Sequence, residues 1–454
     1  MTLDKIIGTA CRTARNAIGV DQFEVFGTET KTLGVYIDDG SIKSVEEKLD
    51  RGIAIRIARG KRIGQSSATC DGIKDAERCV RLASDLATAS PKDRNFEQFS
   101  AGGQIALAPK VFDERIESAT TEELAEIASS IVNCCTEKGK VEVPLGLLRV
   151  STIELRIVNS NGVDASHRCT MLYLRFTTKA DGDMSGEGIE EFYSTHLSDV
   201  DPFAIGNSLK EGAKKSAQAV PFRGRRVGDT VLTPANFAEM LLTSVGHAID
   251  GENVHRKRSA WANKIGETVA SSMVTILDDP GDERGILSSS IDDEGTPTAR
   301  KTIIEKGVLR QFIYDCYTAT LEGAKSSGNG LRRNPIDAHG IYRTPLSISP
   351  INLVLVPGKK SRDSLISSID DGILIERVAA PEVNPINGAF AMEVRCGSVI
   401  EKGDIIQTIN HALLVGNMFE ALMKVKDIAN DATVVKSCIV PTVSIESLEL
   451  IGGN

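Results

Sequence analysis

The segment Val35-Tyr-Ile-Asp-Asp-Gly-Ser-Ile42 sets the architecture of the first part of the chain. The pair Asp39-Gly40 stands between two apolar runs, at residues 32–37 and 42–47, and this arrangement predicts a β hairpin. Glycine suits such a turn because it adopts positive φ without strain. Similar runs at 23–26 and 52–57 predict further strands, so the chain opens with a β-rich unit.

Segments of helical periodicity accompany these strands. Apolar residues recur at helical spacing in the first twenty residues and at 71–88 and 119–137, and a further helix is expected at 202–219. Thr120 precedes an acidic turn and suits an N-cap. We therefore expect an α+β fold of two domains: an N-terminal α/β sandwich-like domain over residues 1–221, and a β-rich C-terminal domain over residues 222–454.

The C-terminal part contains two similar sequences. Ile303-Ile-Glu-Lys-Gly-Val-Leu-Arg-Gln-Phe-Ile313 resembles Val399-Ile-Glu-Lys-Gly-Asp-Ile-Ile-Gln-Thr-Ile409. Each predicts a strand, a glycine turn and a second strand. Shared hairpin chemistry explains the likeness at least as well as duplication of a domain does.

The composition is typical of a soluble globular protein with more than one core: 454 residues, 41% hydrophobic and 25% charged. No apolar stretch reaches the roughly 18 residues of a membrane span, and charges in the first helix interrupt any signal-peptide core. Nine cysteines without paired-ligand spacing predict a reduced, cytoplasmic protein. The net charge of -9 argues against a nucleic-acid partner.

A helix expected to begin near Pro234 carries the most informative residues. Its apolar stripe includes Leu242, which is therefore expected in the core. Set against an HExxxH metallopeptidase motif, Leu242 occupies the first ligand position, Thr243 the position of the general base and His247 that of the second ligand. A catalytic zinc needs about three protein ligands and a carboxylate base. The sequence therefore predicts a degenerate motif with no catalytic residue.

The remaining candidate ligands are weak. We interpret His247 as a structural histidine whose ring is satisfied locally; a relic ligand and a hydrogen-bond donor to a peptide are the alternatives. Cys438 is a second candidate ligand, but the following Ile-Val-Pro favours a buried strand cysteine. His255, His339 or His411 would have to complete any metal site.

A basic stretch is centred on His255-Arg-Lys-Arg258 and includes Arg223, Arg225, Arg226 and Lys264. It is explained by a solvated face. The alternative is a clamp, formed by His255, Arg256 and Arg258, on a peptide carboxylate or an acidic partner, because arginine pairs with carboxylates through two hydrogen bonds. Acidic residues at 278–279, 282–283 and 292–294 compete as partners within the chain.

The glycine loop Ser326-Ser-Gly-Asn-Gly330 precedes Arg332 and Arg333. It lacks the GKS/T ending of a phosphate-binding loop. We expect it to line a cleft that receives peptide, with Asn329 and Arg332 as candidate binding residues.

Several blocks of sequence form an ordered series: Gly251-Glu-Asn-Val-His-Arg-Lys-Arg-Ser259, Thr275-Ile-Leu-Asp-Asp-Pro280, Asp292-Asp-Glu-Gly-Thr-Pro-Thr298 and Ser327-Gly-Asn-Gly-Leu-Arg332. This series resembles the TldD/PmbA family, on its PmbA (TldE) arm. The resemblance implies that a TldD arm carries HExxxH and a distant cysteine ligand, and pairs with a PmbA arm that lacks them. It also implies proteolysis of small or unfolded polypeptides, including maturation of peptide antibiotics and degradation of antitoxins.

The resulting hypothesis is a non-catalytic subunit that forms a dimer with a TldD-like chain and holds extended peptides by backbone pairing to β edges. No cofactor is expected in this chain, and zinc is expected in the TldD-like partner. Two alternatives stay open: a metallopeptidase active in its own right as a homodimer, and a peptide-binding module without a protease partner.

Overall fold

The computed structural model describes residues 2–106, 108–181 and 186–453. Over these residues, a unit of helices and strands is followed by a β-rich unit, as the sequence predicts. None of the described helices combines the length and the apolar character that crossing a membrane requires.

A six-stranded sheet forms the N-terminal unit, in the spatial order β3-β2-β1-β4-β5-β6, and all its neighbouring strands are antiparallel. The strands are β1 (Gln22–Asp38), β2 (Ser41–Arg59), β3 (Arg62–Thr69), β4 (Val141–Asn159), β5 (Asp164–Ala180) and β6 (Gly186–Ser194). The two edges of this sheet are therefore β3 and β6.

The hairpin expected at Asp39-Gly40 is confirmed. Asp38 pairs with Ser41 across a turn in which Asp39 has φ 49° and Gly40 has φ 70°, the positive angles of a type I′ turn. The two C-terminal hairpins are also confirmed, and they turn in the same way at Lys306-Gly307 and Lys402-Gly403. Local turn chemistry therefore accounts for their similar sequences.

The strands of this hairpin are longer than the sequence predicts. The runs at 23–26 and 32–37 both lie on β1, and those at 42–47 and 52–57 both lie on β2. The polar segment that joins the first two runs is buried: Thr28 and Thr30 are each 1% exposed, and the Thr30 hydroxyl donates to Ala338 O at 3.1 Å. The predicted break in β1 was wrong because the C-terminal domain covers these threonines, and β2 continues without a break because it pairs with β1 along this stretch.

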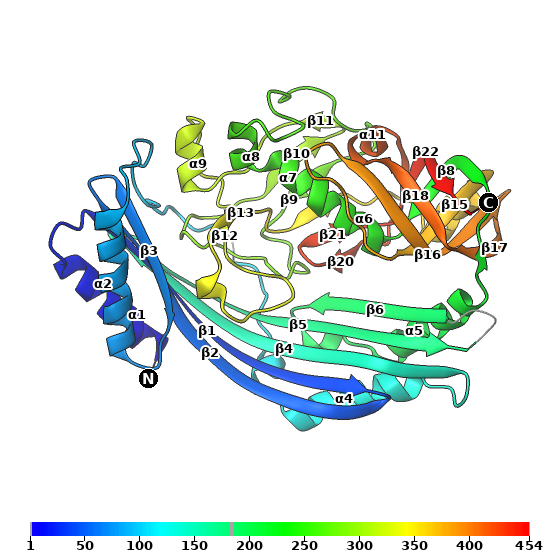
Figure 1. Ribbon diagram of the computed structural model, residues 1–454, viewed down its shortest axis with the longest axis horizontal. Helices are drawn as coiled ribbons and strands as arrows, with labels where there is room; N and C mark the ends of the chain where they lie inside the picture. The colour runs from blue at the N-terminus through cyan, green and yellow to red at the C-terminus, as the bar shows by residue number, and fades with distance from the viewer. Residues whose placement is uncertain (1, 107, 182–185, 454) are drawn as a thin grey trace.

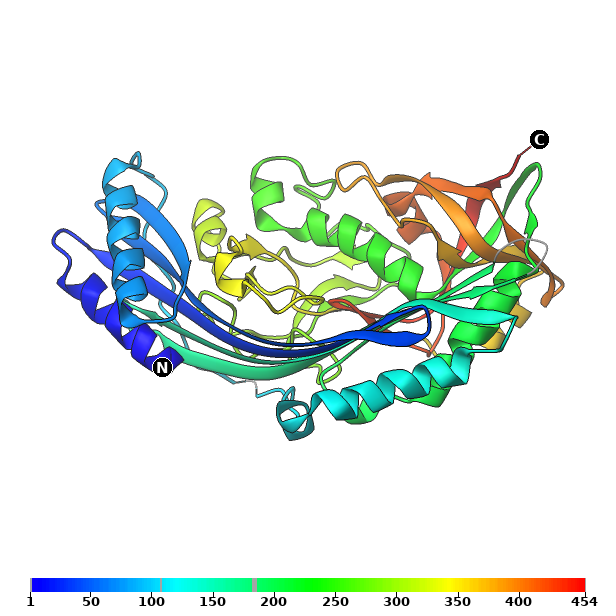
Figure 2. The ribbon, with the colours of Figure 1, turned by 60° about the horizontal axis from the view of Figure 1, so that its bottom comes forward.

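Helices cover the other face of the sheet at both of its ends (Figures 1 and 2). They are α1 (Leu3–Asn16) and α2 (Ile73–Ala89) at one end, and α4 (Thr121–Cys135) and α5 (Pro202–Ala217) at the other, with α3 (Glu114–Ser118) and η1 (Leu197–Asp199) as short connections. The helices expected at 71–88, 119–137 and 202–219 are thus confirmed. The Thr120 hydroxyl caps α4 by accepting from Glu123 N at 3.1 Å.

Alternation along β1 explains this layering. Successive side chains of a strand point to opposite faces, so Val25 and Val35 face the helices. Phe26 faces the C-terminal domain and packs in one cluster with Ala338 and Tyr342. Figure 1 shows the long strands curving beneath the C-terminal domain.

Two sheets build the C-terminal domain around one large apolar core that includes Trp261 and Phe237. The larger sheet contains β7 (Val220–Pro221), β8 (Arg225–Leu232), β15 (Asp371–Val378), β16 (Ala389–Glu401), β17 (Asp404–Asn410), β18 (Ala412–Asn417), β19 (Val425–Ile428) and β22 (Val443–Ile451). The smaller one contains β9 (Ile276–Asp278), β10 (Lys301–Glu305), β11 (Val308–Leu309), β14 (Leu353–Leu355), β20 (Thr433–Val435) and β21 (Cys438–Val440). A two-stranded ladder joins β12 (Gly330–Leu331) and β13 (Ser347–Ile348).

Short helices connect these strands. They are α6 (Pro234–Leu241), η2 (Leu242–Gly246), α7 (His247–Ile249), α8 (Gly251–His255), α9 (Cys316–Leu321), η3 (Ile341–Arg343), α10 (Arg362–Ser367) and α11 (Met418–Met423). At the junction of the domains, α5 ends at Ala217 and β7 pairs with β17. The C-terminal sheet therefore begins just before the limit expected at residue 221.

Candidate functional site

The degenerate motif lies on a helix that changes its winding. Helix α6 begins at Pro234, as the sequence predicts, and passes into the π-helical turn η2. In an α-helix, side chains five residues apart diverge by roughly 140°. In a π-helix, residues i and i+5 are hydrogen-bonded neighbours along one side. The π turn therefore places positions 242 and 247 on the same side, as two ligands of an HExxxH motif require.

The side chains at these positions do not provide metal ligands. Leu242, expected in the core, packs against the domain core but is only half-buried, and Thr243 is also partly exposed. Asn253 Nδ2 lies 3.1 Å from His247 Nδ1, and the carbonyl oxygen of Arg258 lies 3.3 Å from His247 Nε2. Each ring nitrogen of His247 thus has a partner within the chain.

The other candidate ligands are dispersed. Cys438 is fully buried on β21, where its thiol donates to Ala238 O at 3.7 Å and burial raises its pKa. His255 lies 2.6 Å from Glu322, His339 lies 2.8 Å from Asp337, and His411 lies 3.7 Å from Glu393. Within residues 2–106, 108–181 and 186–453, no group of three or more His, Cys, Asp or Glu side chains could hold a metal ion.

The basic stretch is largely occupied by ion pairs within the chain. Arg256 pairs with Glu252 at 2.7 Å on the same helix, Arg225 pairs with Glu449, and Arg226 pairs with Asp371. The acidic residues expected to compete for these arginines have other partners. Asp278 pairs with Lys301, Asp279 with Arg300, Asp282 with Arg284, Asp293 with Arg333 and Glu294 with Arg56. His255, Arg256 and Arg258 nevertheless remain on the surface.

Asn329 occupies the inside of its loop. It is fully buried, and its amide nitrogen donates to Asp278 Oδ2 at 2.7 Å and to Ser349 O at 2.9 Å. Its amide oxygen accepts from the Ser327 hydroxyl at 2.7 Å. The side chain therefore anchors the glycine loop from within instead of lining its surface.

Beside this loop, a buried charge network joins the two domains. Arg56 of β2 donates through Nε to Glu24 Oε1 at 2.8 Å and through Nη2 to Glu294 Oε1 at 2.8 Å. Glu24 and Glu294 are each 1% exposed. Burial disfavours the charge on Arg56, but the two glutamates outweigh this effect and raise its pKa.

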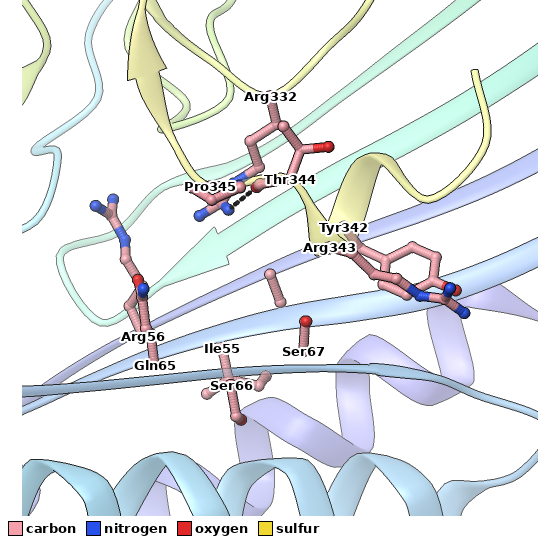
Figure 3. A pocket seen from close by; sticks show the side chains of 11 residues that line it. Ile55, Arg56, Gln65, Ser66, Ser67, Arg332, Tyr342, Arg343, Thr344 and Pro345 are labelled. Carbon is pink, nitrogen blue, oxygen red and sulfur yellow. Dashed lines mark hydrogen bonds between the residues drawn. The ribbon is translucent and has the colours of Figure 1, made fainter. Parts of the chain in front are cut away.

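A cavity of about 160 Å³ opens next to this network, between β2 and β3 on one side and residues 342–345 on the other (Figure 3). Arg332, the second candidate residue of the glycine loop, lines the cavity together with Arg56 and Arg343. The tertiary structure thus brings Arg332 into a concave site and separates it from His255, Arg256 and Arg258, none of which lines this cavity.

Comparisons with known proteins match three successive parts of the chain, two of them within the N-terminal unit. The PmbA/TldA metallopeptidase domain 1 matches residues 23–87, the central domain matches residues 114–217, and the C-terminal domain matches residues 225–452. The last of these spans half of the chain by itself. The chain belongs to the PmbA/TldD family.

Individual relatives of this PmbA/TldD family member align along most of its length. A metalloprotease TldD homologue of Haemophilus influenzae is 25% identical over 407 residues, which cover 87% of this chain and 82% of that protein. Metalloprotease PmbA of Escherichia coli O157:H7 is 23% identical over 451 residues, covering 94% and 91%. The crystal structure of TldE from Thermococcus kodakarensis superposes with a TM-score of 0.89 at 22% identity and covers 99% of each chain, which shows a common fold.

The family description implies a metal, and the residues at the π turn do not fit one. A leucine side chain has no donor atom, a threonine hydroxyl is not a general base at neutral pH, and both nitrogens of His247 are engaged. Catalytic zinc takes about three protein ligands plus a water. We therefore assign no step to a metal in this family member.

Two of the charged residues near the cavity, Glu24 and Arg56, were missed by sequence reasoning. A signal existed, because both stand in apolar runs that form strands, at positions whose neighbours alternate toward the C-terminal domain. A charge on the inward side of a strand is rarely left unpaired. The second partner of Arg56, Glu294, lies too far along the chain for local patterns to connect it with these two residues.

Proposed function

We propose that this chain is the non-catalytic, PmbA/TldE-type subunit of a peptidase whose catalytic subunit is a zinc-bearing TldD-like chain. The substrates are small unfolded peptides. The observation that carries the proposal is the π turn, which keeps positions 242 and 247 on one side of the helix while leucine and an engaged histidine occupy them. A helix that retains this geometry without its donors suits a partner that shapes a site without performing the hydrolysis.

The free part of β2 supports the role as a partner. Among the described strands, β3 pairs with β2 only from Gly52 onward, and Arg51 O accepts from Cys70 N at 2.9 Å, so residues 41–50 form an open edge. Exposed apolar side chains lie here and on β4, which is separated from β2 by β1: Ile42 is 42% exposed, Val45 51%, Leu49 59% and Leu145 59%. Open strand edges pair with other strands, and clustered exposed apolar residues indicate contact surfaces.

Co-expression with the TldD-like chain of the same genome tests this proposal. We expect the two chains to elute together in size-exclusion chromatography and to cleave a fluorogenic unstructured peptide that this chain alone leaves intact. The double variant Val45→Asp/Leu49→Asp is expected to lose the complex. The matched control Ile386→Asp, at a side chain 54% exposed in the C-terminal domain, is expected to retain it.

The His247→Ala variant separates the proposal from its first rival, the homodimeric metallopeptidase. In the complex, we expect turnover within about two-fold of wild type, because an engaged structural histidine contributes little to a site in the other subunit. Stoichiometric zinc in the purified wild-type chain, lost together with peptidase activity in this variant, would establish the rival instead. The second rival, a peptide-binding module, gains support if no HExxxH-bearing chain binds.

A further inference from the structure

The cavity beneath residues 342–345 has an unusual charge balance. Its lining includes three arginines, Arg56, Arg332 and Arg343, together with the polar side chains of Gln65 and Ser67, and contains no aspartate or glutamate. Gln65 and Ser67 extend from β3 on the same face as Arg56, since Arg56 pairs with Gln65 and Ala54 with Ser67. Figure 3 shows these side chains around the cavity, with Arg332 opposite the strands.

The three arginines differ in how their charge is compensated. Arg56 lies between two glutamates, whose two negative charges exceed its own positive charge. Arg332 is 6% exposed, and its guanidinium forms no ion pair with any described residue. Its Nη1 donates to Thr344 O at 2.7 Å, its guanidinium carbon lies 5.4 Å from the Phe26 ring centroid, and its Nε lacks a hydrogen-bond partner among the described residues.

A buried guanidinium with an open donor is costly unless an acceptor reaches it. The cavity provides the space for such an acceptor beside Arg332. Arg343 lies exposed at the rim, where it bonds to Thr69, so it adds a second positive charge at the mouth. A carboxylate fits this arrangement, because it is planar, accepts hydrogen bonds only, and pairs with arginine through both oxygens.

We propose that this cavity binds the carboxylate of a peptide, either its C-terminus or an acidic side chain, with Arg332 as the buried donor and Arg343 as the outer cation. This inference rests on the proposed function, which supplies peptides as ligands. The edge strand β3 lies beside the cavity and offers backbone groups to an extended chain. The site therefore selects peptides with a free C-terminus or an acidic residue, while the backbone contacts accept peptides of many different sequences.

Fluorescence anisotropy with the full chain tests the proposal. The probes are three rhodamine-labelled octapeptides of alternating alanine and serine: one with a free C-terminus, one with a C-terminal amide, and one amidated but ending in glutamate. A charge-assisted hydrogen bond is worth about 1.5–3 kcal/mol, so the free acid is expected to bind about 10- to 100-fold more tightly than the amide. Recovery of affinity by the glutamate probe would identify acidic side chains as a second source of the carboxylate. Equal binding of all three probes would overturn the proposal.

Variants of Arg332 and Arg343 test whether these two residues bind the carboxylate. Arg332→Gln is expected to abolish the preference for the free acid, and Arg332→Lys to retain part of it. Because a buried substitution can impair folding, Arg343→Gln at the exposed rim serves as the second test and is expected to weaken free-acid binding about three-fold, as loss of a solvent-exposed pair does. The control Arg78→Gln, on the outer surface of α2 with a side chain 72% exposed, is expected to bind like wild type. An undiminished preference in both Arg332→Gln and Arg343→Gln would place the carboxylate elsewhere.

The two proposals fail in distinguishable ways. If the chain binds a TldD-like partner while the acid and amide probes bind alike, only the carboxylate site is refuted. If the free acid is preferred while no TldD-like chain binds, only the subunit role is refuted.

Discussion

Replacing Arg56 with methionine should weaken the contact between the two domains and lower the free energy of unfolding. The variant keeps the volume of the side chain and removes the cation that Glu24 and Glu294 share. Three charge-assisted hydrogen bonds disappear, and two carboxylates at 1% exposure lose their partner. Removing one member of a buried ion pair costs about 3–5 kcal/mol. We expect the upper part of this range, because one arginine serves two acids.

The loss should depend on pH in a defined direction. Burial raises the pKa of Glu24 in the folded protein, and Arg56 opposes this rise. Without Arg56 the folded-state pKa moves further above the unfolded value of about 4.3. A raised carboxyl pKa means that the folded state gains stability as the pH falls through that pKa. The loss of unfolding free energy caused by Arg56→Met should therefore become smaller when the pH is lowered from 8 to 5.

Urea denaturation, followed by far-UV circular dichroism and by fluorescence of the single buried Trp261, measures the effect. The double variant Arg56→Met/Glu24→Gln should regain about 1–2 kcal/mol, because one of the two uncompensated charges is gone. Arg78→Met on the surface provides the matched control. A loss below about 1 kcal/mol, equal at pH 5 and pH 8, would refute the reasoning, since surface pairs have that magnitude.

Three further predictions concern burial and packing. Burial, reinforced by Arg333, lowers the pKa of His167 to about 3, so the stability of the protein should fall as the pH drops below about 6.5. In His167→Gln, the midpoint of urea unfolding should change less between pH 6.5 and pH 4 than in wild type. The same pH dependence in both proteins would contradict this. A Cβ at Gly64 would lie 2.1 Å from Ala83 O and 2.2 Å from Ala87 N of α2, so Gly64→Ala should cost about 1–3 kcal/mol in thermal unfolding. The control Gly8→Ala, whose Cβ would meet only the end of the Arg12 side chain at 3.6 Å, should lose less, and equal losses would argue against the packing explanation. Cys438, fully buried with a raised thiol pKa, should react with a disulfide reagent only after unfolding, as mapped by mass spectrometry; labelling of the native protein would contradict its placement.

Much of the local structure could be predicted because its causes lie within a few residues. Asp39-Gly40 specifies its turn through the φ angles that these residues tolerate, and Thr120 caps α4 through a bond to Glu123, three residues later. Pro234 begins α6 because a first helical turn does not use its missing N–H. The spacing from Leu242 to His247 predicts a degenerate motif from sequence alone, and this stays a prediction. Only the structure shows the π turn that places positions 242 and 247 on the same side of the helix.

Burial by residues far away in the sequence could not be predicted from the sequence. The polar segment with Thr28 and Thr30 predicted a break between two strands, because no residue close to it in the sequence shows that the C-terminal domain covers it. The sequence predicted Arg332 as a binding residue beside the glycine loop, but only packing against β2 and β3 placed it in a cavity, with no hydrogen-bond partner for its Nε among the described residues. Turns, caps and motif spacing depend on neighbours along the backbone, so the order of residues suffices to specify them. Charge compensation and enclosure depend on groups that meet only after both domains have folded and packed together.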